Sequence, residues 1–69
     1  MDTIVLREEF IKLGQALKAA GFVESGVDAK LEIQDGNVSV NGEVETRRGR
    51  KLYDGDVVDY NGHKLYIKK

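Results

Sequence analysis

Hydrophobic residues in the first third of the chain follow two different spacings. Residues 3–6 are β-branched or apolar without a break, which predicts a short strand. From residue 8 to residue 20 the apolar positions recur at intervals of three and four, which predicts a helix with one buried face. That face consists of Phe10, Leu13, Leu17 and Ala20. We expect Glu8 and Glu9 to complement the helix dipole in the first turn, and Gly21 to end the helix.

A second helix is predicted between Ser25 and Gly36. The Ser25 hydroxyl can cap the free amides of the first turn, and Asp28 follows three residues later, as in a variant of the capping box. The apolar surface of this helix, which is spaced less regularly than in the first, is supplied by Val27, Ala29, Leu31 and Ile33.

The second half of the chain alternates short apolar runs with turn signals. Residues 38–40, 57–60 and 64–67 are predicted strands, separated by the turns Asn41-Gly42, Asp54-Gly55 and Asn61-Gly62. Asn-Gly is a strong hairpin signal because both residues tolerate positive φ. The whole pattern predicts an α+β fold with two helices packed on a small antiparallel sheet. With 69 residues, we expect a single domain over residues 1–69 with one modest core.

The charges of the chain are unevenly distributed. It has 11 basic and 12 acidic residues and a formal net charge of -1, yet one short run holds four cations and no acid. This run is Thr46-Arg47-Arg48-Gly49-Arg50-Lys51. Concentrated cations create a directional field, and the planar fork of arginine can grip phosphate oxygens. The run therefore indicates an anion-binding loop, with nucleic acid as the leading ligand, while a solvated basic turn stays open as the alternative.

Little in the sequence points to catalysis or metal binding. There is no cysteine, and the one histidine, His63, follows a turn without a nucleophile placed beside it by a recognisable motif. The carboxylates Asp54, Asp56 and Asp59 lack the spacing of a calcium loop. We therefore expect a non-enzymatic protein with no catalytic residue, no metal ligand, no cofactor and no small-molecule substrate.

Nothing at the start of the chain suggests a secretory signal. Its apolar run is three residues long, which is too short for a secretory signal or a membrane span. We expect a cytoplasmic protein that does not engage membranes. The nearly balanced charge also argues against strong non-specific binding to duplex DNA, which depends on many phosphate contacts.

A longer pattern runs through both predicted helices and the first hairpin. Its members are Lys12-Leu13-Gly14, Leu17, Gly21, Ser25-Gly26, Ala29, Glu32-Ile33, Gly36, Val38, Val40-Asn41-Gly42 and Gly55-Asp56. In this register the chain resembles the RNA-binding domain first described in ribosomal protein S4, the alpha-L motif. It is similar to the short bacterial members that consist of this domain alone. It departs from the family pattern at Lys12, which replaces an arginine, at Gly14, where the family has aspartate, and at Gly26, where arginine is common.

The resemblance implies binding of structured RNA, with ribosomal RNA or a ribosome assembly intermediate as the leading ligand. The residues expected to contact it are Lys12, Lys18, Lys30, Thr46, Arg47, Arg48, Arg50 and Lys51. Lys12 and Lys18 are six positions apart on the predicted helix, so only one of them is expected to reach the binding face. Tyr53, adjacent to the basic loop, is the tyrosine expected to stack on a base.

An alternative function stays open at this point. The second predicted helix and its flanks carry Glu24, Asp28, Glu32 and Asp35, which would suit a protein-interaction module that binds a basic partner. With either function we expect a monomer.

Overall fold

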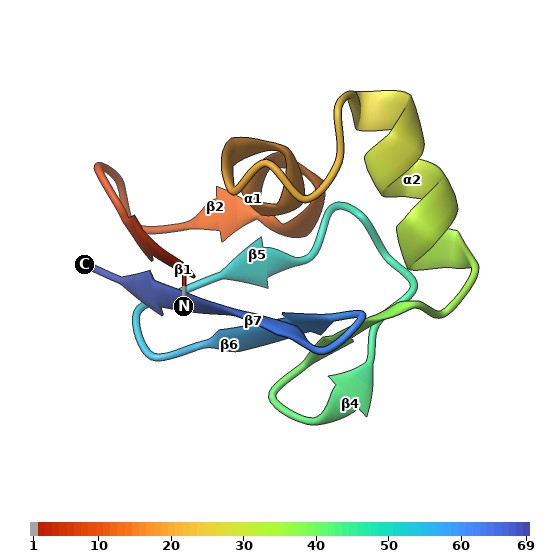
Figure 1. The fold of residues 1–69 in the computed structure, drawn as a ribbon. Coiled ribbons are helices and arrows are strands. Elements are labelled where there is room, and N and C mark those ends of the chain that lie inside the picture. The colour runs from red at the N-terminus through yellow and green to blue at the C-terminus, as the bar shows by residue number, and fades with distance from the viewer. Residues whose placement is uncertain (1) are drawn as a thin grey trace.

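The computed structural model describes residues 2–69, which form two helices and two β-sheets (Figure 1). The strands are β1 (Asp2–Val5), β2 (Ile11–Lys12), β3 (Val38–Val40), β4 (Glu43–Val44), β5 (Lys51–Leu52), β6 (Val57–Tyr60) and β7 (His63–Lys68). The helices are α1 (Leu13–Ala19) and α2 (Gly26–Gln34), and both lie on one side of the larger sheet (Figure 1). This arrangement confirms the predicted α+β class. Over residues 2–69, no helix has the length and apolar character needed to cross a membrane.

The larger sheet has the strand order β1-β7-β6-β3-β4, and a separate ladder joins β2 to β5. Both Asn-Gly hairpins are confirmed, with Asn41 and Asn61 at φ values of 52° and 50° in two-residue turns. One pairing departs from the predicted antiparallel sheet, because β1 runs parallel to β7 at the sheet edge. These two strands come from opposite ends of the chain, so no hairpin sets their relative direction.

Helix α1 is much shorter than the predicted helix over residues 8–20. The backbone of Lys12 is extended, and the amides of Leu13 and Gly14 donate to the carbonyls of Arg50 and Arg48 at 2.8 and 3.0 Å. The loop before β5 therefore takes up the first free amides of the helix. Glu8 and Glu9 precede β2 and do not stand in the first turn of α1, so their predicted role at the helix dipole was wrong.

Helix α2 begins and ends where the sequence predicts. The Ser25 Oγ accepts a hydrogen bond from the Asp28 amide at 3.1 Å, which confirms the cap. After the helix, Gly36 has a φ of +80°, a conformation that glycine adopts at little energetic cost. Of the predicted apolar residues of α2, Ala29 and Ile33 are buried, whereas Val27 and Leu31 are exposed to solvent.

The core lies between the two helices and the inner face of the larger sheet. Leu13 and Leu17 are fully buried there, as the predicted helix face requires, and they belong to the same cluster as Ile33 and Leu52. The sheet contributes Val38, Val40, Val58, Leu65 and Ile67 to that cluster. Two short helices are thereby held at fixed positions against a sheet, and the loop between β4 and β5 reaches across to α1.

Candidate functional site

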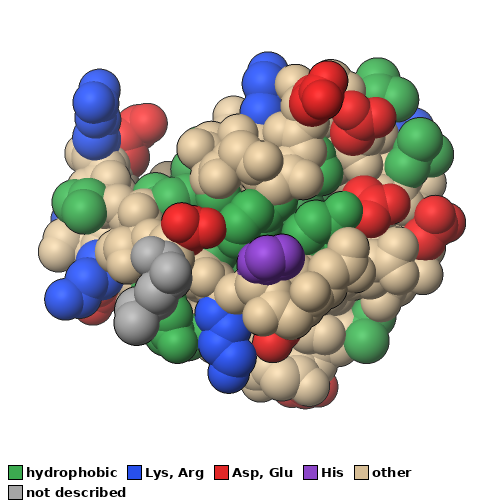
Figure 2. Space-filling model, in the orientation of Figure 1, with side chains coloured by type: hydrophobic (Ala, Val, Ile, Leu, Met, Phe, Trp, Pro, Cys, Tyr) green, Lys and Arg blue, Asp and Glu red, His purple; other side chains and the backbone are tan. Residues whose placement is uncertain are grey.

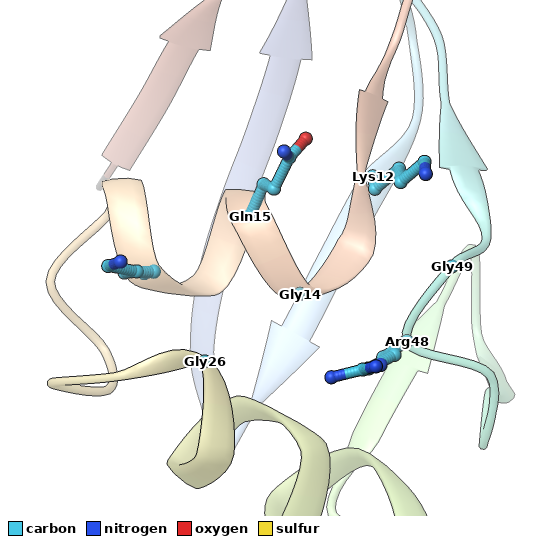
Figure 3. Close-up of a pocket in the computed structure, with 7 residues that line it drawn as sticks. Lys12, Gly14, Gln15, Gly26, Arg48 and Gly49 are labelled. Carbon is cyan, nitrogen blue, oxygen red and sulfur yellow. The ribbon is translucent and has the colours of Figure 1, made fainter.

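A hollow of about 310 Å³ opens where α1, the start of α2 and the loop between β4 and β5 meet (Figure 3). It is lined by Lys12, Gly14, Gln15, Lys18, Gly26, Arg48 and Gly49. Three of these residues are cations, and none of the described lining residues is acidic. An anion entering the hollow would therefore meet positive charge contributed by α1, by its N-cap and by the basic loop.

A backbone hydrogen bond to α1 positions Arg48 beside the hollow. Its carbonyl accepts the Gly14 amide at 3.0 Å, and in Figure 3 its side chain extends into the space between α1 and α2. A Cβ at Gly14 would lie 3.6 Å from both the Cβ and the carbonyl oxygen of Arg48, an ordinary van der Waals contact. A Cβ at Gly26 would meet no described atom within 4 Å beyond its chain neighbours and the backbone of its own helix. The two glycines that depart from the family pattern thus line the same hollow as Lys12, the third departure, and their missing side chains leave it open.

Lys12 and Lys18 both line this hollow, although their six-residue spacing on the predicted helix placed them on different faces. The reason is that Lys12 is the extended N-cap residue of α1 rather than a helical residue. Helical spacing therefore does not relate the directions of these two side chains. Lys12 also stands directly opposite Lys51 in the β2–β5 ladder, so both side chains leave the same face of that ladder.

Two arginines of the basic loop are held by a buried carboxylate. Glu45 is only 6% exposed, and its oxygens accept hydrogen bonds from the Arg47 Nε and Nη2 at 3.0 Å and from the Arg50 Nη1 at 3.1 Å. The Arg47 amide donates a further bond at 3.1 Å. These hydrogen bonds, above all those from the Arg47 side chain, outweigh burial and lower the pKa of Glu45 to about 2.

The remaining predicted residues surround this centre without lining the hollow. Arg47 is bound to Glu45 but keeps a side chain that is 75% exposed. Lys51 places its Nζ 4.7 Å from the centre of the Phe10 ring. Thr46 and Lys30 are exposed, and Lys30 lies one helical turn beyond Gly26, on the same side of α2.

Acidic side chains gather on another part of the surface, over α2 (Figure 2). A second hollow of about 390 Å³ is lined there by Phe22, Val23, Glu24, Asp28, Leu31, Glu32 and Tyr60. The Tyr60 hydroxyl donates to Glu32 at 2.6 Å, and this hydrogen bond, with burial and nearby acids, raises the pKa of Tyr60. The molecule therefore presents a cationic hollow and an acidic hollow, and both include residues of α2.

Neither Glu45 nor Phe10 was identified from the sequence as part of the site. The available signal for Glu45 was its position two residues before Arg47, which allows a carboxylate to accept a local hydrogen bond. Phe10 was assigned to a helix, although it precedes β2. Among residues 2–69, no group of three or more His, Asp or Glu side chains is arranged to hold a metal ion.

This geometry, with two short helices on a sheet and a basic loop joined to the first helix, defines the chain as an alpha-L domain. The chain belongs to the S4 domain family, whose model matches residues 4–68.

Several bacterial proteins are similar to this chain. It is 49% identical over 61 residues to the Bacillus subtilis protein named "Probable ribosome maturation protein RlbA", covering 88% of this chain and 86% of that one. It is 40% identical over 57 residues to the Escherichia coli protein named "Putative RNA-binding protein YbcJ", covering 83% and 81%. The solution structure of YbcJ, described as revealing an alpha-L motif involved in RNA binding, superposes with a TM-score of 0.77 at 37% identity. That superposition covers 100% of this chain and 89% of YbcJ.

Proposed function

We propose that this protein binds structured RNA without catalysing a reaction, and that its ligand is ribosomal RNA or a ribosome assembly intermediate. The placement of Lys12, Lys18 and Arg48 around one hollow without an acidic lining residue carries this proposal. A folded RNA brings several phosphates close together, and a compact cationic surface complements that shape better than it complements a straight duplex. We further propose that residues 1–69 act as one domain and as a monomer in the cytoplasm.

The three cations that line the hollow would contact phosphate in different ways. Arg48 can grip one phosphate with two parallel hydrogen bonds, whereas Lys12 and Lys18 act as compact charges around it. Arg47 and Arg50 are already hydrogen-bonded to Glu45, so they contribute to the loop's shape as well as to its field. We therefore expect Arg48 to matter more for RNA affinity than Arg47 or Arg50, although all three stand in the same run.

The family relatives support the choice of RNA and of ribosome assembly. One of the similar proteins is named for RNA binding and another for ribosome maturation, and each matches more than 80% of this chain. Both names come from bacterial proteins, which is the basis for proposing a bacterial ribosomal ligand. The cationic hollow supplies a physical reason for RNA binding as such, and it indicates which residues would act, which the relatives' names do not.

The test is the salt dependence of binding to fragmented ribosomal RNA, measured for Lys12→Ala combined with Arg48→Ala. Each lost phosphate contact makes the negative slope of log K against log salt shallower by about 0.7 to 0.9, so the double variant should make it shallower by roughly 1 to 2. The matched control is Lys64→Ala combined with Lys68→Ala, which removes equal charge from exposed positions on β7. Equal losses in both double variants would mean that only bulk charge acts and would refute the hollow as the binding site.

The acidic hollow supports a second candidate function, the binding of a basic protein segment. Glu24, Asp28 and Glu32 stand there beside Leu31, which is 52% exposed. Carboxylates next to exposed apolar surface suit a segment that carries both lysines or arginines and apolar residues. This candidate uses a different surface from the RNA site, so variants of one surface can be tested without altering the other.

A further inference from the structure

The outer face of the β2–β5 ladder combines aromatic and cationic side chains. The observed register places Ile11 opposite Leu52 and Lys12 opposite Lys51. Continued by one residue, the same register places Phe10 opposite Tyr53, and their ring centres are 6.1 Å apart at an interplanar angle of 51°. Because side chains alternate between the two faces of a strand, these two aromatics share a face with the two lysines. Leu52, on the opposite face, is fully buried in the core.

Tyr53 differs from the other two tyrosines of the chain in its surroundings. Tyr53 is 47% exposed to solvent, whereas Tyr60 and Tyr66 are half-buried. Tyr60 is stacked on Phe22 with ring centres 5.8 Å apart, and its hydroxyl is hydrogen-bonded to Glu32. Tyr53 touches Phe10 in a tilted arrangement that leaves much of its own surface to solvent. Of the three tyrosines, it therefore offers the most accessible aromatic surface for a further ring.

The backbone of Tyr53 is held in place before any ligand arrives. Its amide donates to the Asp56 Oδ2 at 2.8 Å, and the other oxygen of that carboxylate accepts the Asn41 Nδ2 at 2.9 Å. Asp56 is thus engaged by two donors and fixes the start of the turn that follows β5. A platform whose backbone is already ordered loses less conformational freedom when a ligand stacks on it.

The two lysines of this face stand opposite each other, and like charges in directly opposed positions repel. Lys51 lies over the Phe10 ring, which offsets part of this repulsion through a cation–π contact. A phosphate bound between Lys12 and Lys51 would attract both ammonium groups and so reduce this repulsion further. Since Lys12 also lines the cationic hollow, the aromatic face and the hollow are continuous through that residue.

We propose that the face formed by Phe10, Lys12, Lys51 and Tyr53 binds one unpaired nucleotide of the RNA, with the base stacked on Tyr53 and its phosphate between the lysines. This inference rests on the proposed RNA-binding function and adds a preference for RNA that has a single-stranded segment beside its folded part. Stacking on an aromatic ring is tolerant of base identity, because every base has a π-face. The site therefore selects for an unpaired nucleotide rather than for a particular sequence.

The experiment compares two RNA hairpins that share one stem and loop, one blunt and one with a short single-stranded extension containing 2-aminopurine. We expect Tyr53→Ala to weaken binding of the extended hairpin roughly 5- to 150-fold and to leave the blunt hairpin unaffected. Tyr53→Phe should retain both the affinity and the quenching of 2-aminopurine fluorescence. Val44→Ala, which truncates an exposed apolar residue on β4, should change the affinity for neither hairpin.

Two kinds of result separate this inference from the function on which it rests. If Arg48→Ala weakens both hairpins while Tyr53→Ala affects them equally or not at all, RNA binding stands and the stacking site is refuted. If the unchanged protein binds neither hairpin at low salt, the RNA-binding function itself is refuted. If it binds both and Arg48→Ala has no effect on either, RNA binding stands and the cationic hollow is refuted as its site. A thermal melt of each variant verifies that the altered protein is folded. A folded Tyr53→Phe protein that no longer binds the extended hairpin would also refute stacking.

Discussion

Replacing Glu45 with glutamine tests whether the basic loop is organised by a buried ion pair. The substitution keeps the shape of the side chain and one acceptor oxygen, but it removes the charge that holds Arg47 and Arg50. A carboxyl whose pKa falls from 4.5 to about 2 on folding would stabilise the protein by roughly 3 kcal/mol at neutral pH. Because the Arg47 side chain is 75% exposed, water screens the pair, and we expect about 1–2 kcal/mol instead.

The direction of the Glu45 pKa shift determines the pH range in which this stabilisation is present. The pKa of Glu45 is lower in the folded state than the ordinary value of 4.5, so the stabilisation is complete above that value and is lost as pH falls toward about 2. The contribution of Glu45 to the unfolding free energy can be measured by urea unfolding, monitored by circular dichroism at several pH values from 7 downward. The difference in unfolding free energy between the unchanged protein and Glu45→Gln should shrink steadily through the acid range.

The matched control is Glu43→Gln, which removes the same charge from an exposed position in β4. Its effect on the unfolding free energy should stay within about 0.5 kcal/mol at neutral pH. A Glu45→Gln cost that is the same at pH 7 and at pH 2 would show that packing rather than charge accounts for it, and would refute the ion-pair explanation of the loop.

Two further predictions concern the core and the acidic surface. Leu17 is fully buried between α1 and the sheet, so Leu17→Ala should lower the unfolding free energy by about 2–5 kcal/mol, and an unchanged cooperative urea transition would contradict the described core. Glu24→Gln combined with Asp28→Asn should leave RNA affinity unchanged or slightly higher, because these acids repel phosphate from the acidic hollow. Filter binding to ribosomal RNA measures this affinity. Loss of RNA binding by a folded double variant would overturn the assignment of surfaces.

Local sequence signals predicted those features that local interactions produce. The Ser25 cap depends on a hydrogen bond to a residue three positions away, and the Asn-Gly hairpins depend on two residues that tolerate positive φ. The buried positions Leu13 and Leu17 followed from periodicity, even though α1 begins later than that periodicity suggested. The apolar spacing from residue 10 onward is the same whether residues 10–12 are helical or extended, so periodicity alone could not locate the start.

The features that were predicted wrongly from the sequence depend on contacts between segments far apart in the chain. The start of α1 is decided by carbonyls of Arg48 and Arg50, more than thirty residues further along the chain, which accept its first amides. The direction of β1 is decided by β7, at the other end of the chain. Such contacts form only after the chain has collapsed, and no local propensity encodes which carbonyl or strand will be nearby.

The site shows the same division between local and tertiary information. The sequence by itself determined that the cations of residues 46–51 form a concentrated charge, because their adjacency needs no folding. Only the tertiary structure decided how those cations are used: Glu45 engages Arg47 and Arg50, while Arg48 joins Lys12 and Lys18 around a hollow left open by Gly14 and Gly26. The physical reason is that charge belongs to individual residues, whereas a binding surface depends on distances and burial between residues that folding brings together.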